Sequence, residues 1–179
     1  MKHYKKKLLY KSLKKLVKQT KLIQKESFVT DQSPLIGKSK SFLKEYGTVK
    51  VCAARRSGHT FALSKFALKE AKKGKKVLVL AWNLDHASRC RNRIVEKCKE
   101  KNIIQKLTLD SIEFEEGRIL FGTQGQAKTN GFGSLVGFSA DLILVDVASM
   151  WSKSSIELIY DRLGPCLTFT KYPMIIFLG

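Results

Sequence analysis

The sequence lacks the features that mark secreted, metal-binding or membrane-spanning proteins. Its four cysteines form no C-x-x-C pair and its three histidines lie apart from them, so neither a zinc site nor a disulfide framework is indicated. Reduced, mostly buried thiols are expected instead. The longest apolar runs, such as residues 174–178, are too short to cross a bilayer, and no signal-peptide core follows the lysine-rich start. We therefore expect a soluble cytoplasmic protein.

Acidic residues are also scarce. Only 15 Asp and Glu stand against 34 Lys and Arg, which gives a formal net charge of +19. Such a charge creates a strong positive field at the surface, and polyanions are the natural partners of a protein that carries it. The 179 residues, 44% of them apolar, have the length of about one domain and suffice for a core.

The first 25 residues contain no acid at all. Six residues recur there at helical spacing, which predicts a basic amphipathic helix over residues 1–25; they are Leu9, Leu13, Leu16, Val17, Thr20 and Ile23. This helix could contact nucleic-acid phosphates, dock its apolar stripe on the rest of the protein, or lie on an anionic membrane, although the stripe lacks Trp and Phe. The candidate nucleic-acid ligands are Lys5, Lys6, Lys7, Lys11, Lys14, Lys15, Lys18, Lys21 and Lys25.

The remaining pattern predicts a connector over 26–47, with a short helix at 38–46, and then a compact domain over 48–179. We expect strands at 48–53, 76–82, 107–114, 118–123, 141–145 and 174–178. We expect helices at 60–73, 83–101 and 154–163, a turn at 115–117 and a long loop over 122–137. Strands alternate with helices and the middle strands are continuously apolar. The pattern predicts an α/β fold of three layers with a mostly parallel central sheet, preceded by the basic helix.

The segment AARRSGHT, residues 53–60, has nearly the form of a phosphate loop, in which glycines shape the turn, a lysine reaches the phosphates and a hydroxyl holds Mg²⁺. It follows a predicted strand and precedes a predicted helix. Asp146 ends another apolar strand about 85 residues later, as the aspartate of the Mg²⁺ shell does. Ser57, Gly58 and Thr60 fit the loop pattern. His59, however, stands in the position of the lysine.

From 48 to 179 the chain resembles the ATPase domain of tailed-phage large terminase subunits and, more distantly, superfamily-2 helicases. The segments that carry the resemblance are VCAARRSGHT, KVLVLAWN, SIEFEEGRILFGTQGQ, GFGSLVGFSADLILVDVASMW and PMIIFLG. The resemblance implies a P-loop NTPase fold, a phage origin, residence in the host cytoplasm and a role in viral DNA packaging or metabolism. It also implies DNA rather than RNA as ligand, a phage or host protein complex as partner, and ATP with Mg²⁺, held by Asp146, if nucleotide binds.

Several positions depart from the family pattern. Walker A is degenerate at Ala53 and His59, Walker B has Val147 where the catalytic glutamate stands, and Val136 replaces a frequent arginine. The printed residues end where the coupling motif begins, so the resemblance implies neither lid nor nuclease domain within them. Loss of a catalytic base commonly costs about 10²–10⁴ in rate, and neutral histidine lacks the permanent charge of lysine. We therefore expect a pseudoenzyme that binds nucleic acid.

Alternatives remain open at this level. A weak ATPase motor subunit could take its catalytic acid from Asp85, Glu113 or a neighbouring subunit, and a regulatory protein could dock on a true terminase or replication complex. Arg55 and Arg56 could form an anion site at a helix N-terminus or be solvated surface charges. Trp82 and Trp151 could stack on bases or simply pack in the protein.

Overall fold

The computed structural model describes residues 2–30, 47–52, 58–99, 103–167 and 173–179. Within these ranges the chain forms one seven-stranded sheet in the order β1-β7-β6-β2-β5-β4-β3. The strands are β1 (Gly47–Val51), β2 (Lys76–Ala81), β3 (Lys106–Leu107), β4 (Ser111–Glu113), β5 (Arg118–Thr123), β6 (Leu142–Asp146) and β7 (Met174–Leu178). The first five in sheet order pair in parallel, and β4 and β3 continue the sheet in antiparallel pairing.

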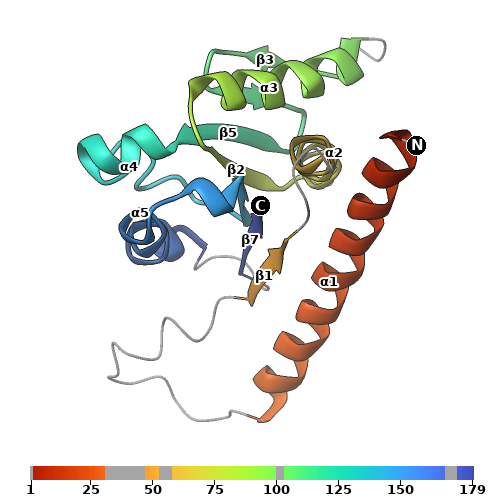
Figure 1. Ribbon diagram of the computed structural model, residues 1–179, viewed down its shortest axis with the longest axis vertical. Helices are drawn as coiled ribbons and strands as arrows, with labels where there is room; N and C mark the ends of the chain where they lie inside the picture. Colours follow the sequence, from red (N-terminus) through yellow and green to blue (C-terminus); the bar gives the residue numbers. More distant parts are fainter. Residues whose placement is uncertain (1, 31–46, 53–57, 100–102, 168–172) are drawn as a thin grey trace.

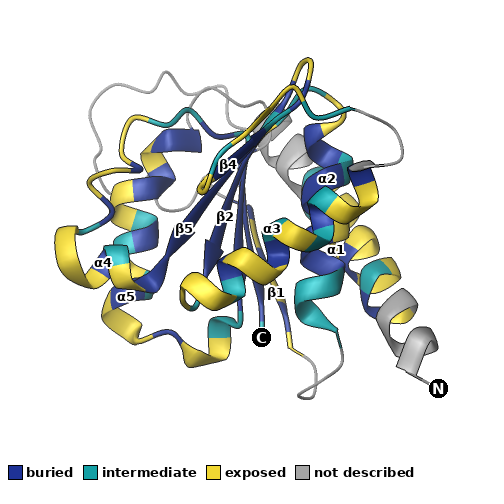
Figure 2. Cartoon of the chain, turned by 90° about the horizontal axis from the view of Figure 1, so that it is seen from above, coloured by how far each residue is buried: buried dark blue, intermediate teal, exposed yellow. Residues whose placement is uncertain are grey.

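Helices cover both faces of this sheet (Figure 1). One face carries α1 (Lys2–Thr30), α2 (His59–Ala71) and α3 (Leu84–Lys99); the other carries α4 (Gln124–Asn130), α5 (Lys153–Leu158) and the π-helical turn Ile159–Leu163. Side chains alternate along the strands, so each face has its own apolar core. Figure 2 shows the strands buried between the helical layers. The predicted three-layer α/β fold with a mostly parallel sheet is confirmed, and it is that of a P-loop NTPase-like domain.

The predicted amphipathic helix is present and continues to Thr30, beyond the expected end at residue 25. Leu9, Leu13 and Val17 are buried against the domain, where α1 packs on α2 and β1, while Leu16 is 37% exposed. The apolar stripe therefore docks on the protein and is not available to a membrane surface. Among the described helices, none is long and apolar enough to cross a bilayer. The short helix expected at 38–46 lies outside the described residues.

Two elements differ from the prediction. The expected strand at 107–114 is divided into β3 and β4, because the Thr108 hydroxyl accepts a hydrogen bond from the Ser111 N–H at 3.0 Å and turns the chain. The expected loop over 122–137 begins with the helix α4. Gln126 Oε1 accepts from the Thr123 N–H at 2.8 Å, half of a capping box, and Gly131 ends the helix at φ +56°. The T-x-x-Q spacing of that box was present in the sequence.

The turn between β4 and β5 lies against the end of α2. The Phe114 N–H donates to the Gly117 carbonyl at 2.8 Å, as expected for the predicted turn at 115–117. A methyl group at Gly117 would lie 2.0 Å from the Ala71 carbonyl oxygen and 2.9 Å from that of Lys75. The backbones of the turn and of α2 therefore meet at a point where only glycine fits.

Candidate functional site

The carboxyl ends of the parallel strands bring the two predicted phosphate motifs together. Thr60 lies in the first turn of α2, after β1, and Asp146 is the last residue of β6. One strand, β7, separates β1 from β6 in the sheet. The Thr60 hydroxyl nevertheless donates a hydrogen bond to Asp146 Oδ2 at 2.9 Å. Thus the hydroxyl and the carboxylate that the sequence assigns to a Mg²⁺ site are neighbours, and Mg²⁺ would find them on the same edge of the sheet.

Asp146 is completely buried. Burial raises the pKa of its carboxyl group, and the hydrogen bond from Thr60, the charge of His86, the N–H of Val147 and the charge of His59 oppose that rise. The Val147 N–H donates to Asp146 Oδ1 at 3.1 Å, and the Trp151 indole N–H donates to the Asp146 carbonyl at 3.1 Å. The side chain is therefore held in one orientation, with Oδ2 shared between Thr60 and the space beyond it.

His59 begins α2 in the position of the phosphate-loop lysine. Its pKa lies below the usual value, since partial burial disfavours the charged form and the charge of Asp146 only partly opposes this effect. At neutral pH the ring is therefore neutral. Gly58 precedes it at φ +96°, in the left-handed region that favours glycine. The loop keeps its turn geometry here, but this position supplies no permanent charge for a phosphate.

Val147 follows Asp146 and occupies the place of the catalytic glutamate. Its backbone is left-handed, with φ 52° and ψ 46°, a conformation that is uncommon for any side chain and most strained for a β-branched one. Its aliphatic side chain accepts no proton and orients no water. The residue therefore combines backbone strain with the loss of the chemical group.

Replacing Val147 by asparagine is expected to raise the free energy of unfolding by about 1 kcal/mol, because asparagine adopts the left-handed region with little strain. Urea denaturation measures the change. Val147→Thr is the matched control, since threonine keeps the branched Cβ and should bring no gain. Equal changes in the two variants would show that the backbone at this residue is not strained.

His86, near the start of α3, also faces the site, although the sequence did not single it out. Its Nδ1 lies 3.9 Å from Asp146 Oδ2 and has no hydrogen-bond partner among the described residues. Asn83 caps this helix, accepting the His86 N–H at 2.9 Å. Since α3 starts at the carboxyl end of β2, the rule that brings Thr60 and Asp146 together could also have located His86. Within the described residues, no group of three His, Cys, Asp or Glu side chains could hold a metal ion.

Other predicted residues are not brought to this edge, or are not described. Arg55, Arg56 and Ser57 lie outside the described residues, as do the side chains of Lys5, Lys6, Lys7 and Lys25. Glu113 pairs in register with Arg118, the first residue of β5, so it lies at the opposite edge of the sheet from Asp146 and cannot serve as its catalytic acid. Asp85 is exposed and bound by Arg89 at 2.7 Å.

The strand order, the turn at Gly58 and the Thr60–Asp146 pair define an α/β domain of the phosphate-loop NTPase class. Comparisons with solved structures narrow the fold to that of the large terminase ATPase domain of tailed phages. The ATPase domain of the large terminase of Thermus phage P74-26 matches with TM-score 0.54 and 17% identity, over 73% of this chain and 58% of that one. The large terminase of a second, thermophilic bacteriophage matches with TM-score 0.56 and 10% identity, over 76% and 35%.

This chain thus spans about 58% and 35% of the lengths of those two proteins. At such identities the likeness establishes the fold, and function has to be inferred from the residues of this chain. No family model matches the sequence, and no curated protein matches it either.

Proposed function

We propose that this protein binds nucleic acid, DNA in preference to RNA, as a terminase-like domain that has lost ATP hydrolysis and acts in viral DNA packaging or metabolism. The observation that carries the proposal is a group of basic side chains that the packing of α1, α2 and α3 gathers on one side of the protein. We refer to it as the lysine face. Its members are Lys14, Lys21, Lys65, Lys69, Lys73, Lys75 and Lys97.

These lysines come from distant parts of the chain and are close enough to repel one another. The pKa of Lys69 is lowered by burial and then by the charges of Lys14, on α1, and Lys73. The pKa of Lys21 is lowered by burial and then by the charge of Lys75, and that of Lys97 by burial and then by the charge of Lys65. Packing like charges together is unfavourable unless an anion lies among them, and a phosphate backbone is such an anion.

Aromatic rings and a single carboxylate order the lysine face. The Lys65 ammonium lies 4.6 Å from the centre of the Tyr10 ring, which joins α2 to α1, and Lys97 lies 4.5 Å from the centre of the Phe61 ring. Glu70 binds Lys73 at 2.7 Å and Lys75 at 2.6 Å, so it offsets one positive charge of the seven. The lysine face therefore keeps a large excess of positive charge at fixed positions.

The second half of the proposal, loss of hydrolysis, rests on His59 and Val147. A neutral ring replaces a permanent cation, and an aliphatic side chain replaces a carboxylate. A slow ATPase is the second candidate function. The hydrogen bond between Thr60 and Asp146 favours it, because this pair retains the ligands that Mg²⁺ needs.

One titration series tests the proposal, with labelled single-stranded and double-stranded DNA and RNA at about 50 and 200 mM salt, with and without ATP and Mg²⁺. If duplex DNA engages six of the lysines, its affinity should fall about 10³-fold between the two salt concentrations, through release of condensed counterions. ATP should leave the affinities and the melting temperature unchanged. Absence of binding at the lower salt concentration, or affinity insensitive to salt, would refute nucleic-acid binding, whereas stabilisation by ATP would favour the ATPase candidate.

A further inference from the structure

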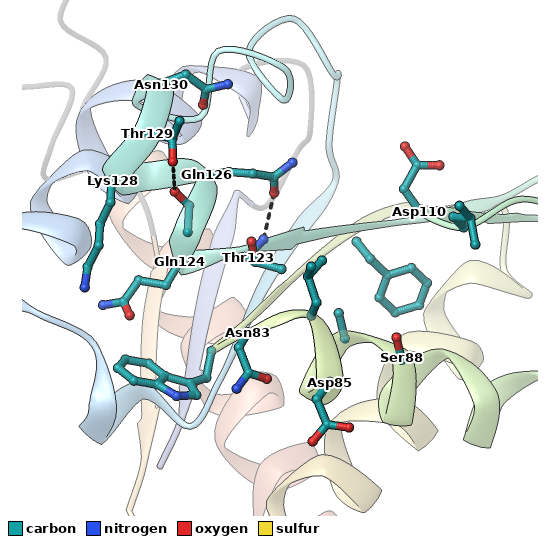
Figure 3. A pocket seen from close by; sticks show the side chains of 16 residues that line it. Asn83, Asp85, Ser88, Asp110, Thr123, Gln124, Gln126, Lys128, Thr129 and Asn130 are labelled. Atoms are coloured by element: carbon teal, nitrogen blue, oxygen red, sulfur yellow. Dashed lines mark hydrogen bonds between the residues drawn. The ribbon is translucent and has the colours of Figure 1, made fainter.

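A cavity of about 880 Å³ opens at the carboxyl ends of β2 and β5, between the start of α3 and the helix α4 (Figure 3). Trp82 and Asn83, which follow β2, line one side, and the residues from Thr123 to Asn130 line the other. The cavity is one strand away from Asp146, since β2 pairs with β6. Thr60 and Asp146 do not line it. Carboxyl ends of parallel strands are where α/β sheets commonly bind ligands.

A buried amide in this cavity has an unmet hydrogen-bond donor. Gln124 is only 3% exposed, and its Nε2 has no hydrogen-bond partner among the described residues. In Figure 3 its side chain extends toward the cavity beside that of Lys128. The oxygens of two neighbouring amides are engaged, since Gln126 accepts from the Thr123 N–H at 2.8 Å and Asn83 from the His86 N–H at 2.9 Å. Buried donors are rarely left unpaired, so Gln124 calls for an acceptor on a ligand.

The cavity also has a flat aromatic wall. Trp82 is half-buried, packs on the core of the α4 and α5 side with part of its surface, and lines the cavity. Trp151 differs, because it is 6% exposed and its indole N–H is bound to the Asp146 carbonyl. Of the two tryptophans that could stack on bases, only Trp82 presents a surface to a cavity. Stacking on such a ring is tolerant of base identity, because every base has a π-face.

The charges around the cavity favour a ligand that is rich in hydrogen-bond acceptors. Lys128 is exposed at its edge. The two lining carboxylates already have partners, since Arg89 binds Asp85 at 2.7 Å and the Thr108 hydroxyl donates to Asp110 at 2.7 Å. A bare phosphate would make no use of the indole, and an apolar side chain would leave the Gln124 amide unpaired. A planar heterocycle with ring nitrogens and carbonyl oxygens satisfies both.

We propose that this cavity binds a nucleobase, stacked on Trp82 and accepting a hydrogen bond from Gln124 Nε2. The base belongs either to a single strand or to a free nucleotide. In the first case the inference rests on the proposed nucleic-acid binding, and in the second it is independent of it.

The decisive measurement compares a labelled oligothymidylate with an abasic strand of the same length and phosphate charge. The wild-type protein should bind the base-bearing strand about tenfold more tightly, which is within the range of stacking. Trp82→Ala and Gln124→Met should each shrink this difference and leave the affinity for the abasic strand unchanged. Gln105→Met is the matched control, because Gln105 is an exposed amide outside the cavity lining.

Thermal melting separates ligand binding from a structural role of Gln124. Since its donor is unpaired, replacing the amide by an apolar side chain of similar length should leave the melting temperature unchanged or raise it. A melting temperature lowered by more than about 4 °C, roughly what 1 kcal/mol produces in a domain of this size, would show that the amide has a structural partner and would overturn the assignment.

Titration with AMP distinguishes the two sources of the base. Quenching of tryptophan fluorescence by AMP in the wild type, absent in Trp82→Phe, would identify a free nucleotide as a ligand. Equal affinity for the two strands, together with no quenching that depends on Trp82, would overturn the inference. If neither strand binds, nucleic-acid binding itself fails, and the AMP titration alone then decides the fate of the cavity assignment.

Discussion

The double variant Lys14→Glu/Lys69→Glu is expected to bind duplex DNA about 10²-fold more weakly than the wild type at about 50 mM salt. Each lost phosphate contact removes about 0.9 from the slope of log affinity against log salt, so two contacts lower the slope by about 1.8. Extrapolated from about 1 M to 50 mM salt, that slope corresponds to about 200-fold in affinity, and the added negative charges repel the backbone further.

This variant should fold as well as the wild type. Lys14 and Lys69 repel each other across the contact between α1 and α2, and two glutamates in their place keep like charges at that point while gaining attraction from Lys73. A thermal melt checks that the loss of affinity is not a loss of structure.

The matched control is Lys153→Glu/Arg162→Glu, which changes the net charge by the same amount. Both of these residues are exposed and lie in the helical layer on the other side of the sheet. It should weaken binding only slightly, through the long-range field, and leave the salt slope nearly unchanged. Equal losses in the two variants would show that net charge, and not the lysine face, governs binding.

Replacing Gly117 by alanine is expected to lower the free energy of unfolding by about 3 kcal/mol, or to prevent folding altogether. The new methyl group would overlap the Ala71 carbonyl oxygen, 2.0 Å away, and neither partner can move, since one belongs to a helix and the other to a turn. Denaturation in urea measures the loss, and expression without soluble protein would be its extreme form.

Gly125→Ala provides the comparison. Gly125 lies in the first turn of α4, and a methyl group there would find its nearest neighbour, the Thr123 hydroxyl, at an ordinary 3.5 Å. Alanine also favours helix over glycine, so this variant should gain about 0.5–1 kcal/mol. A loss below about 1 kcal/mol in Gly117→Ala would mean that the turn and α2 are farther apart than described.

The parts of the site that follow from strand direction were predictable from the sequence. Thr60 and Asp146 could be paired in advance because the carboxyl ends of parallel strands share an edge, and continuous apolar runs located β2, β6 and β7. Helix α4 could also have been found, since the capping signal at Thr123 and Gln126 is local. It was missed because Gly, Gln and Asn dominate the segment and are typical of loops.

The lysine face and the cavity could not be derived in this way. Lys65, Lys69 and Lys73 show helical spacing, but nothing in that spacing places Lys14 beside Lys69. Likewise, the unpaired amide of Gln124 appears only after the neighbouring groups have found their own partners. Both features depend on packing between segments far apart in the chain, about which periodicity within one segment carries no information.

The strand order also constrains the time at which the phosphate loop takes shape. Within the described sheet, β1 pairs with β7 alone, and Gly47 is aligned with Met174, 174 − 47 = 127 residues later. On the ribosome, β1 has no strand to join until residues 174–178 have emerged, whereas β2, β5 and β6 can already pair with one another. Closing so long a loop is slow, and the contact between Thr60 and Asp146 has to wait for it. Since α1 packs on β1 as well as on α2, the docking of α1 would also be completed late, and with it the lysine face.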